Sequence, residues 1–136
     1  MAVWGIGAYY NDSKVKDKAQ DFLRNNFAYI GWKEPEAPAI YQMLTSIKVG
    51  DIIYIKSFSP KTKTLYIKAL GIVIDNKLQY SEDLGTGVMV KWKDEFTEVI
   101  EISITPEMYR NNIYNNSLYE EYDKGIIQKL IEEIMK

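Results

Sequence analysis

The chain of 136 residues contains no cysteine and no histidine. Without cysteine it has no disulfide, no thiolate nucleophile and no cysteine-based zinc site, and without histidine it lacks the commonest metal ligand and the commonest general base. Serine–histidine, cysteine–histidine and zinc-hydrolase chemistries are therefore excluded. The sequence also has no apolar run of about 18 residues and no basic signal segment at its start, so we expect an intact cytoplasmic protein with no membrane partner.

Arginine is scarce as well. Only Arg24 and Arg110 are arginines among the 17 basic residues. Residues 1–94 hold 13 basic against 10 acidic residues (net +3), and residues 95–136 hold 4 against 9 (net −5). Lysine attracts phosphates diffusely and is poorly suited to reading bases, so any affinity for nucleic acid should be modest and salt-sensitive. The alternative is that the lysines only solvate strand faces.

The apolar pattern predicts a single α+β domain with a mostly antiparallel, curled sheet flanked by helices. Strands are expected at 3–8, 27–30, 52–57, 64–75, 88–92 and 97–102, and helices at about 14–25, 37–45 and 126–134. Asn11, Asp12 and Ser13 supply capping side chains for the first helix. Gly71 predicts a bulge or bend that curls the sheet, and residues 85–87 predict a turn.

The end of the chain is expected to form a helical extension over 105–136. The sequence Thr105-Pro106-Glu107 is a helix-start signal, and the apolar residues of 126–134 recur at helical spacing. Such a stripe is typical of a helix that packs on the rest of the domain. An oligomer contact would show the same pattern, so a homo-oligomer formed through this helix stays open.

The order of several short motifs along the chain resembles the EVE-like members of the PUA superfamily, over roughly residues 2–103. The motifs are Trp4-Gly-Ile-Gly-Ala8, Phe22-Leu23, Ile30-Gly-Trp32, Val49-Gly-Asp51, Ile55-Lys-Ser57, Ala69-Leu-Gly-Ile-Val73 and Val90-Lys-Trp92. The sequence is similar to the small domains fused to McrB-type restriction ATPases. The resemblance implies a PUA-like pseudo-barrel that binds nucleic acid, in several groups by lodging one flipped, often methylated base in an aromatic pocket.

Aromatic residues are the first candidates for such a pocket, because stacking offsets the cost of extracting a base. Trp32 follows a glycine and precedes a polar, proline-containing stretch, which favours a place at a loop mouth. Trp92 lies between Lys91 and Lys93, an alternation that suits stacking combined with phosphate contacts, and Tyr9 could close the other side. The alternative is that Trp92 is an ordinary core residue.

Lys56 and Ser57 are the polar candidates, and as neighbours on one strand they point to opposite faces. The Ser57 hydroxyl could bond a ligand edge and Lys56 could take a phosphate, as the Lys-Ser pair at this place in the related domains implies. Alternatively, Ser57 caps the turn that follows.

A catalytic role finds less support. The acidic pair Glu82-Asp83 belongs to no recognisable catalytic motif, and Gly85-Thr86-Gly87 lacks the ending of a phosphate loop. The sequence therefore predicts a non-catalytic domain, without metal or cofactor, that recognises a modified base in DNA or RNA through a pocket around Trp32, Ser57 and Trp92. Two alternatives stay open: a stand-alone protein that sequesters a free or cyclic nucleotide, as a phage anti-defence protein would, and a structural assembly subunit.

Overall fold

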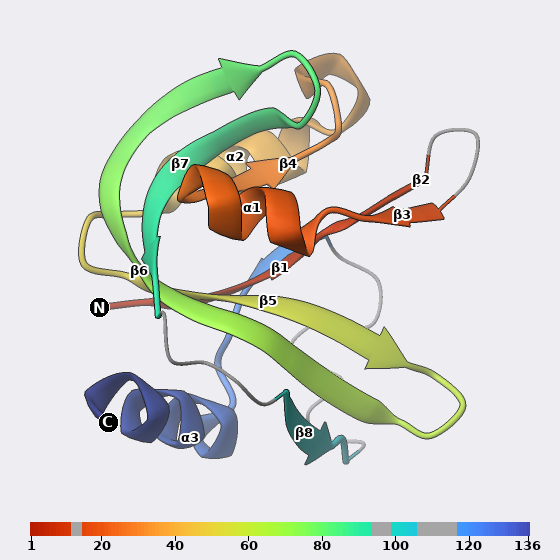
Figure 1. Ribbon diagram of the computed structural model, residues 1–136, viewed down its shortest axis with the longest axis vertical. Coiled ribbons are helices and arrows are strands. Elements are labelled where there is room, and N and C mark those ends of the chain that lie inside the picture. The colour runs from red at the N-terminus through yellow and green to blue at the C-terminus, as the bar shows by residue number, and fades with distance from the viewer. Residues whose placement is uncertain (12–14, 94–98, 106–116) are drawn as a thin grey trace.

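The computed structural model describes residues 1–11, 15–93, 99–105 and 117–136 (Figure 1). The strands are β1 (Val3–Gly7), β2 (Tyr9–Asn11), β3 (Val15–Asp17), β4 (Phe27–Ile30), β5 (Ile52–Ser59), β6 (Thr64–Ser81), β7 (Gly85–Trp92), β8 (Ile100–Ser103) and β9 (Leu118–Glu120). The helices are α1 (Ala19–Asn25), the short 3-10 helix η1 (Glu34–Glu36), α2 (Pro38–Ser46) and α3 (Lys124–Met135).

The main sheet is mixed and curls into a half-barrel. Its strand order is β4-β7-β6-β5-β1-β9, with β8 paired to the first part of β6. Every pairing is antiparallel except that of β1 with β5. Helices α1 and α2 cover one face of this sheet and α3 covers the other (Figure 1). The α+β class and the curled, mostly antiparallel sheet flanked by helices are thereby confirmed.

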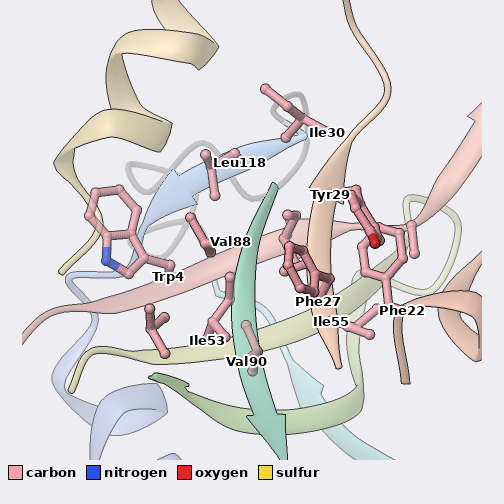
Figure 2. Packing of buried hydrophobic residues seen from close by; sticks show 14 of the residues in the cluster. Trp4, Phe22, Phe27, Tyr29, Ile30, Ile53, Ile55, Val88, Val90 and Leu118 are labelled. Carbon is pink, nitrogen blue, oxygen red and sulfur yellow. The ribbon is translucent and has the colours of Figure 1, made fainter. Parts of the chain in front are cut away.

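Two apolar clusters hold the layers together. Ile53 and Ile55 of β5 point into the first cluster, while Ile52 and Tyr54 point into the second. Both faces of β5 are therefore buried, which explains why its first residues are apolar without interruption. Figure 2 shows the first cluster, in which the rings of Phe22, Phe27 and Tyr29 lie close together, with centroids 5.5 Å (Phe22–Tyr29) and 5.3 Å (Phe27–Tyr29) apart.

The predicted first helix is wrong in its first part. Val15–Asp17 is a strand that pairs with Tyr9–Asn11 in a separate hairpin, and the helix begins only at Ala19. The Asp17 carboxylate accepts the Ala19 amide at 2.9 Å, the role expected of the Asn11–Ser13 segment. Residues 12–14 lie outside the described part of the chain. The pattern misled because Val15 fits a helical apolar series as well as a short strand.

Two glycine predictions also need correction. Gly71 is not the bulge: the register of β6 shifts beside Lys68, opposite the Ile55/Lys56 step, and again around Asp75. Gly71 is instead a close-packing position, since a Cβ there would lie 2.7 Å from the Lys91 carbonyl oxygen. Residues 85–87 begin β7 and are not a turn. Gly85 has φ +102° and a Cβ would lie 2.0 Å from the Ile30 carbonyl oxygen, so only glycine fits.

The C-terminal segment contributes a strand as well as a helix. Within the described part of 105–136, β9 pairs antiparallel with β1 at the sheet edge, and α3 packs its apolar stripe on the second cluster. Asp123 caps α3 by accepting the Ile126 amide at 2.9 Å. The expected helix start at residues 106–107 lies outside the described residues, as do 94–98. Of the helices that the structure describes, none has the length and apolar character needed to cross a membrane.

Candidate functional site

Trp32 lies at the end of the sheet where β1 and β4 finish and β7 and β9 begin. Its side chain is 50% exposed, whereas Trp4 and Trp92 are 3% and 5% exposed. A half-exposed indole presents an apolar ring face to solvent, and tryptophan is a residue type enriched at interfaces. Trp32 is thus where the sequence predicted it, at a loop mouth directly after a strand.

The backbone around Trp32 is held in place by two tyrosines. The Tyr41 hydroxyl of α2 donates to the Trp32 carbonyl oxygen at 2.9 Å and lies 3.1 Å from Thr86 Oγ1. The Tyr10 ring packs against Gly31, where an added Cβ would lie 3.0 Å from the ring, and its hydroxyl donates to the Leu84 carbonyl. The indole therefore projects from a fixed base, which lowers the entropy cost of using it to bind.

Ser117 bonds both Trp32 and Gly7, at the end of β1 beside which Lys56 lies. The Trp32 indole N–H donates to Ser117 Oγ at 3.2 Å, and the Gly7 amide donates to the Ser117 carbonyl at 2.8 Å. Lys56 is the register partner of Gly7, and its Cε lies 3.7 Å from the position of a Cβ on that glycine. We refer to Trp32, Tyr41, Ser117 and Lys56 as the Trp32 site.

The Lys56 side chain lies beside an aromatic ring. Its Nζ lies 5.7 Å from the centroid of the Tyr119 ring, a cation–π arrangement. Burial lowers the pKa of Lys56 to about 8 because the ammonium loses hydration. A negative charge close to this amine would favour its charged form and raise the pKa again.

Ser57 does not join this group. It is half-buried in register with Tyr66, and it alternates with Lys56, whose side chain turns to the face that carries Tyr119. The expected division of Lys56 and Ser57 between opposite faces stays a prediction, since the β5–β6 register shifts at the Ile55/Lys56 step. The proposed ligand contact of Ser57 stays a prediction.

Trp92 is part of the first cluster, which corrects the expectation of an exposed stacking surface there. Its indole N–H donates to the carbonyls of Phe22 at 3.1 Å and Phe27 at 3.2 Å. The inward side of β7 at Val88, Val90 and Trp92 faces the core, so the ring follows the strand alternation into the interior. The structure thus supports the core interpretation that the sequence left open.

The contacts of Lys91, Lys93 and Tyr9 lie outside the Trp32 site. The two lysines border a hollow of about 540 Å³ between the β6–β7 surface and the end of α3. Tyr9 is 50% exposed on β2, with Lys68 Nζ 4.6 Å from its ring centroid, and Lys68 also pairs with Asp17. Their roles toward phosphate and ligand stay predictions.

Sequence reasoning missed three residues that build the Trp32 site or hold it: Tyr10, Tyr41 and Ser117. Tyr41 fits the apolar side of its helix, and no local signal distinguishes a tyrosine that bonds a carbonyl outside its own helix. Ser117 lies 85 positions from Trp32, so only the closure of the sheet brings the two together. The described residues hold no cluster of three or more acidic side chains able to bind a metal ion.

These features define a small α+β protein with a fixed, half-exposed indole and a lysine of lowered pKa at one end of a curled sheet. The sequence matches no model of a known protein family, and it matches no curated protein.

Proposed function

We propose that this protein is a non-catalytic binding domain that takes a planar nucleobase at the Trp32 site. The observation that carries the proposal is the contrast among the three tryptophans, of which only Trp32 is half exposed, on a backbone fixed by Tyr41. Stacking of a base on such a ring is worth about 1–3 kcal/mol and tolerates any base, because every base has a π-face.

The groups around the indole suit the rest of a nucleotide. The hydroxyls of Ser117 and Tyr41 lie within hydrogen-bond distance of Trp32 atoms and belong to residue types that also bond base edges. Lys56 supplies an amine for one phosphate. We propose a modified base in DNA or RNA as the ligand, in keeping with the resemblance to EVE-like members of the PUA superfamily and with a PUA-like assignment of the curled sheet.

Replacing Trp32 with alanine is expected to weaken binding of the cognate nucleotide or oligonucleotide about fivefold or more while the protein stays folded, because a half-exposed ring contributes little to the core. The measurement is isothermal titration calorimetry with nucleoside monophosphates and with single-stranded oligonucleotides that carry methylated or unmodified bases, because Trp32→Ala removes the reporting indole. Tryptophan fluorescence quenching is followed in the wild-type protein as well. Trp4 and Trp92 are buried, so quenching by a stacked base reports on Trp32.

Tyr80→Ala provides the matched control, since Tyr80 is a 73% exposed aromatic residue of β6. It should leave the affinity unchanged, while Trp32→Phe should keep part of it. The proposal fails if no nucleotide or oligonucleotide quenches the wild-type protein, or if Trp32→Ala and Tyr80→Ala bind equally well.

The affinity for a phosphate-bearing ligand is expected to fall as the pH rises through about 8, the pKa of Lys56 in the free protein. The charged amine binds the phosphate, so the ligand raises the pKa in the complex and the affinity falls up to tenfold per pH unit between the free and bound values. Isothermal titration from pH 6.5 to 9.5 (chosen to span about 1.5 units on either side) tests this.

Lys56→Arg should flatten that profile because arginine stays charged over the whole range. The corresponding nucleoside, which has no phosphate, should show the flat profile with the wild-type protein. A wild-type affinity that stays constant or rises above pH 8 would remove Lys56 from the phosphate contact.

A free mononucleotide or cyclic nucleotide is the second candidate ligand, with sequestration as the function. The net charge of −2 favours it, because a long polyanion would be repelled by an acidic protein while a single phosphate needs only local charge. Salt separates the two: oligonucleotide binding should weaken strongly between low and high salt, and binding of a small nucleotide should change little. Assembly through α3 has less to support it, since the helix uses its apolar stripe within the chain.

A further inference from the structure

The hollow between β6, β7 and α3 has a mixed chemistry that the nucleotide proposal does not use. Its volume is about 540 Å³, within the range of small-molecule sites. The residues that line it, here called the isoleucine groove, are Ile72, Ile74, Lys91, Trp92, Lys93, Ile134 and Lys136. Ile72 and Ile74 are 39% and 47% exposed, an apolar floor that faces solvent in the middle of a sheet.

The rim of the isoleucine groove is positively charged. Lys91 is the register partner of Ile72, and its ammonium has no ion pair among the residues that the structure describes. Lys93 Nζ donates to the Lys136 carbonyl at 2.8 Å, and Lys136 pairs with Glu133 at 2.9 Å. Of the residues that line the groove, three are lysines and none is acidic, and Glu133 pairs with one of these lysines.

We propose that the isoleucine groove binds an amphiphilic anion, namely a molecule with a saturated aliphatic chain and a single anionic head. The aliphatic chain would lie over Ile72, Ile74 and Ile134, and the head would face Lys91. Burial of methylene groups supplies the affinity and the lysine rim selects the sign of the head. This proposal is independent of the Trp32 site.

The floor argues against other occupants of similar charge. Strands β6 and β7 are paired with each other here, so the floor offers no free strand edge to the backbone of a peptide, whose amides would be left without partners. A base would find isoleucine in place of an exposed ring, because Trp92 is 5% exposed. A bilayer needs protruding apolar residues, whereas these line a hollow.

The test is a titration of the ¹⁵N-labelled full chain with decanoate below its micelle concentration, followed by NMR. Shifts should saturate at the amides of residues 72–74, 91–93 and 134–136 and leave the Trp32 indole N–H in place, which separates this result from nucleotide binding. The affinity should rise about threefold to fourfold per methylene from octanoate to decanoate. Acetate and decyltrimethylammonium should not bind.

Three variants locate the site. Ile74→Ser should weaken decanoate binding about tenfold and Lys91→Glu about fivefold, while Lys61→Glu, on the exposed turn between β5 and β6, should leave it unchanged. The inference is overturned if decanoate does not saturate, if chain length has no effect, or if Lys91→Glu and Lys61→Glu behave alike. Binding of an isoleucine–aspartate peptide or of anionic vesicles in the absence of decanoate binding would also overturn it.

Discussion

Asp51→Ala is expected to lower the free energy of unfolding by about 3 kcal/mol or more. Asp51 is 5% exposed at the start of β5, and its carboxylate accepts three N–H groups. They are the Ala2 amide at 3.0 Å, the Lys48 amide at 2.9 Å and the Trp4 indole N–H at 2.9 Å. Alanine would leave all three donors without an acceptor, and each unsatisfied buried donor costs about 1–3 kcal/mol.

Urea denaturation measures this loss. Asp83→Ala, in the exposed turn before β7, is the matched control and should change stability by less than about 0.5 kcal/mol. An Asp51→Ala protein as stable as the control would show that these hydrogen bonds contribute nothing.

The same carboxylate predicts acid sensitivity: burial would raise the pKa of Asp51, but the hydrogen bonds from Ala2, Lys48 and Trp4 hold it below its ordinary value.

The direction in which pH changes the contribution of Asp51 to stability follows from the linkage between protonation and folding. A carboxyl whose pKa is lower in the folded state stabilises the protein at a pH above about 3.9 and loses that contribution as the pH falls through the folded pKa. The stability difference between the wild-type protein and Asp51→Asn should therefore shrink below about pH 4.

The sequence predicted the elements whose pattern is set locally. The strands at Val3, Phe27, Ile52 and Val88 and the helices α2 and α3 follow from apolar periodicity and from Gly or Pro at their ends. The sequence did not predict elements that depend on long-range pairing, such as β9, which forms by pairing with β1 at the sheet edge. No local pattern distinguishes Leu118–Glu120 from a polar loop.

For the candidate site, too, the features set by local sequence were predicted and those set by long-range contacts were not. Trp32 was found because Gly31 and the prolines after it mark a loop, which is local information. Trp92 was predicted at an exposed position because basic residues flank it. Adjacent residues of a strand point to opposite faces, so their charge does not indicate which face Trp92 occupies. The approach of Ser117 to Trp32 and to Gly7, beside which Lys56 lies, depends on sheet curvature, which the sequence indicates only in general terms.

Glu121→Ala is expected to lower the free energy of unfolding by about 3 kcal/mol or more. Glu121 is 1% exposed between β9 and α3. Its Oε1 accepts the Tyr54 hydroxyl at 2.7 Å, which itself lies 2.7 Å from the Tyr119 hydroxyl. Its Oε2 accepts the amides of Tyr122 and Asp123 at 3.1 Å each. Alanine would free these donors and leave a cavity, whereas Glu132→Ala, at an exposed position of α3, is the control of small effect.

Glu121→Gln separates the charge from the hydrogen bonds. Its carbonyl oxygen can accept the two amides, and its NH₂ can donate to the Tyr54 hydroxyl if that hydroxyl turns toward Tyr119, so the glutamine variant should be much more stable than the alanine variant.

Burial raises the pKa of Glu121, against the hydrogen bonds from Tyr54 and the amides. A carboxyl with a raised folded pKa stabilises the protein fully below about pH 4.3, and that contribution is lost as the pH rises through the folded value. Relative to the wild-type protein, Glu121→Gln should therefore gain stability from acid to neutral pH in urea denaturation, and a constant difference would mean that Glu121 titrates alike in both states.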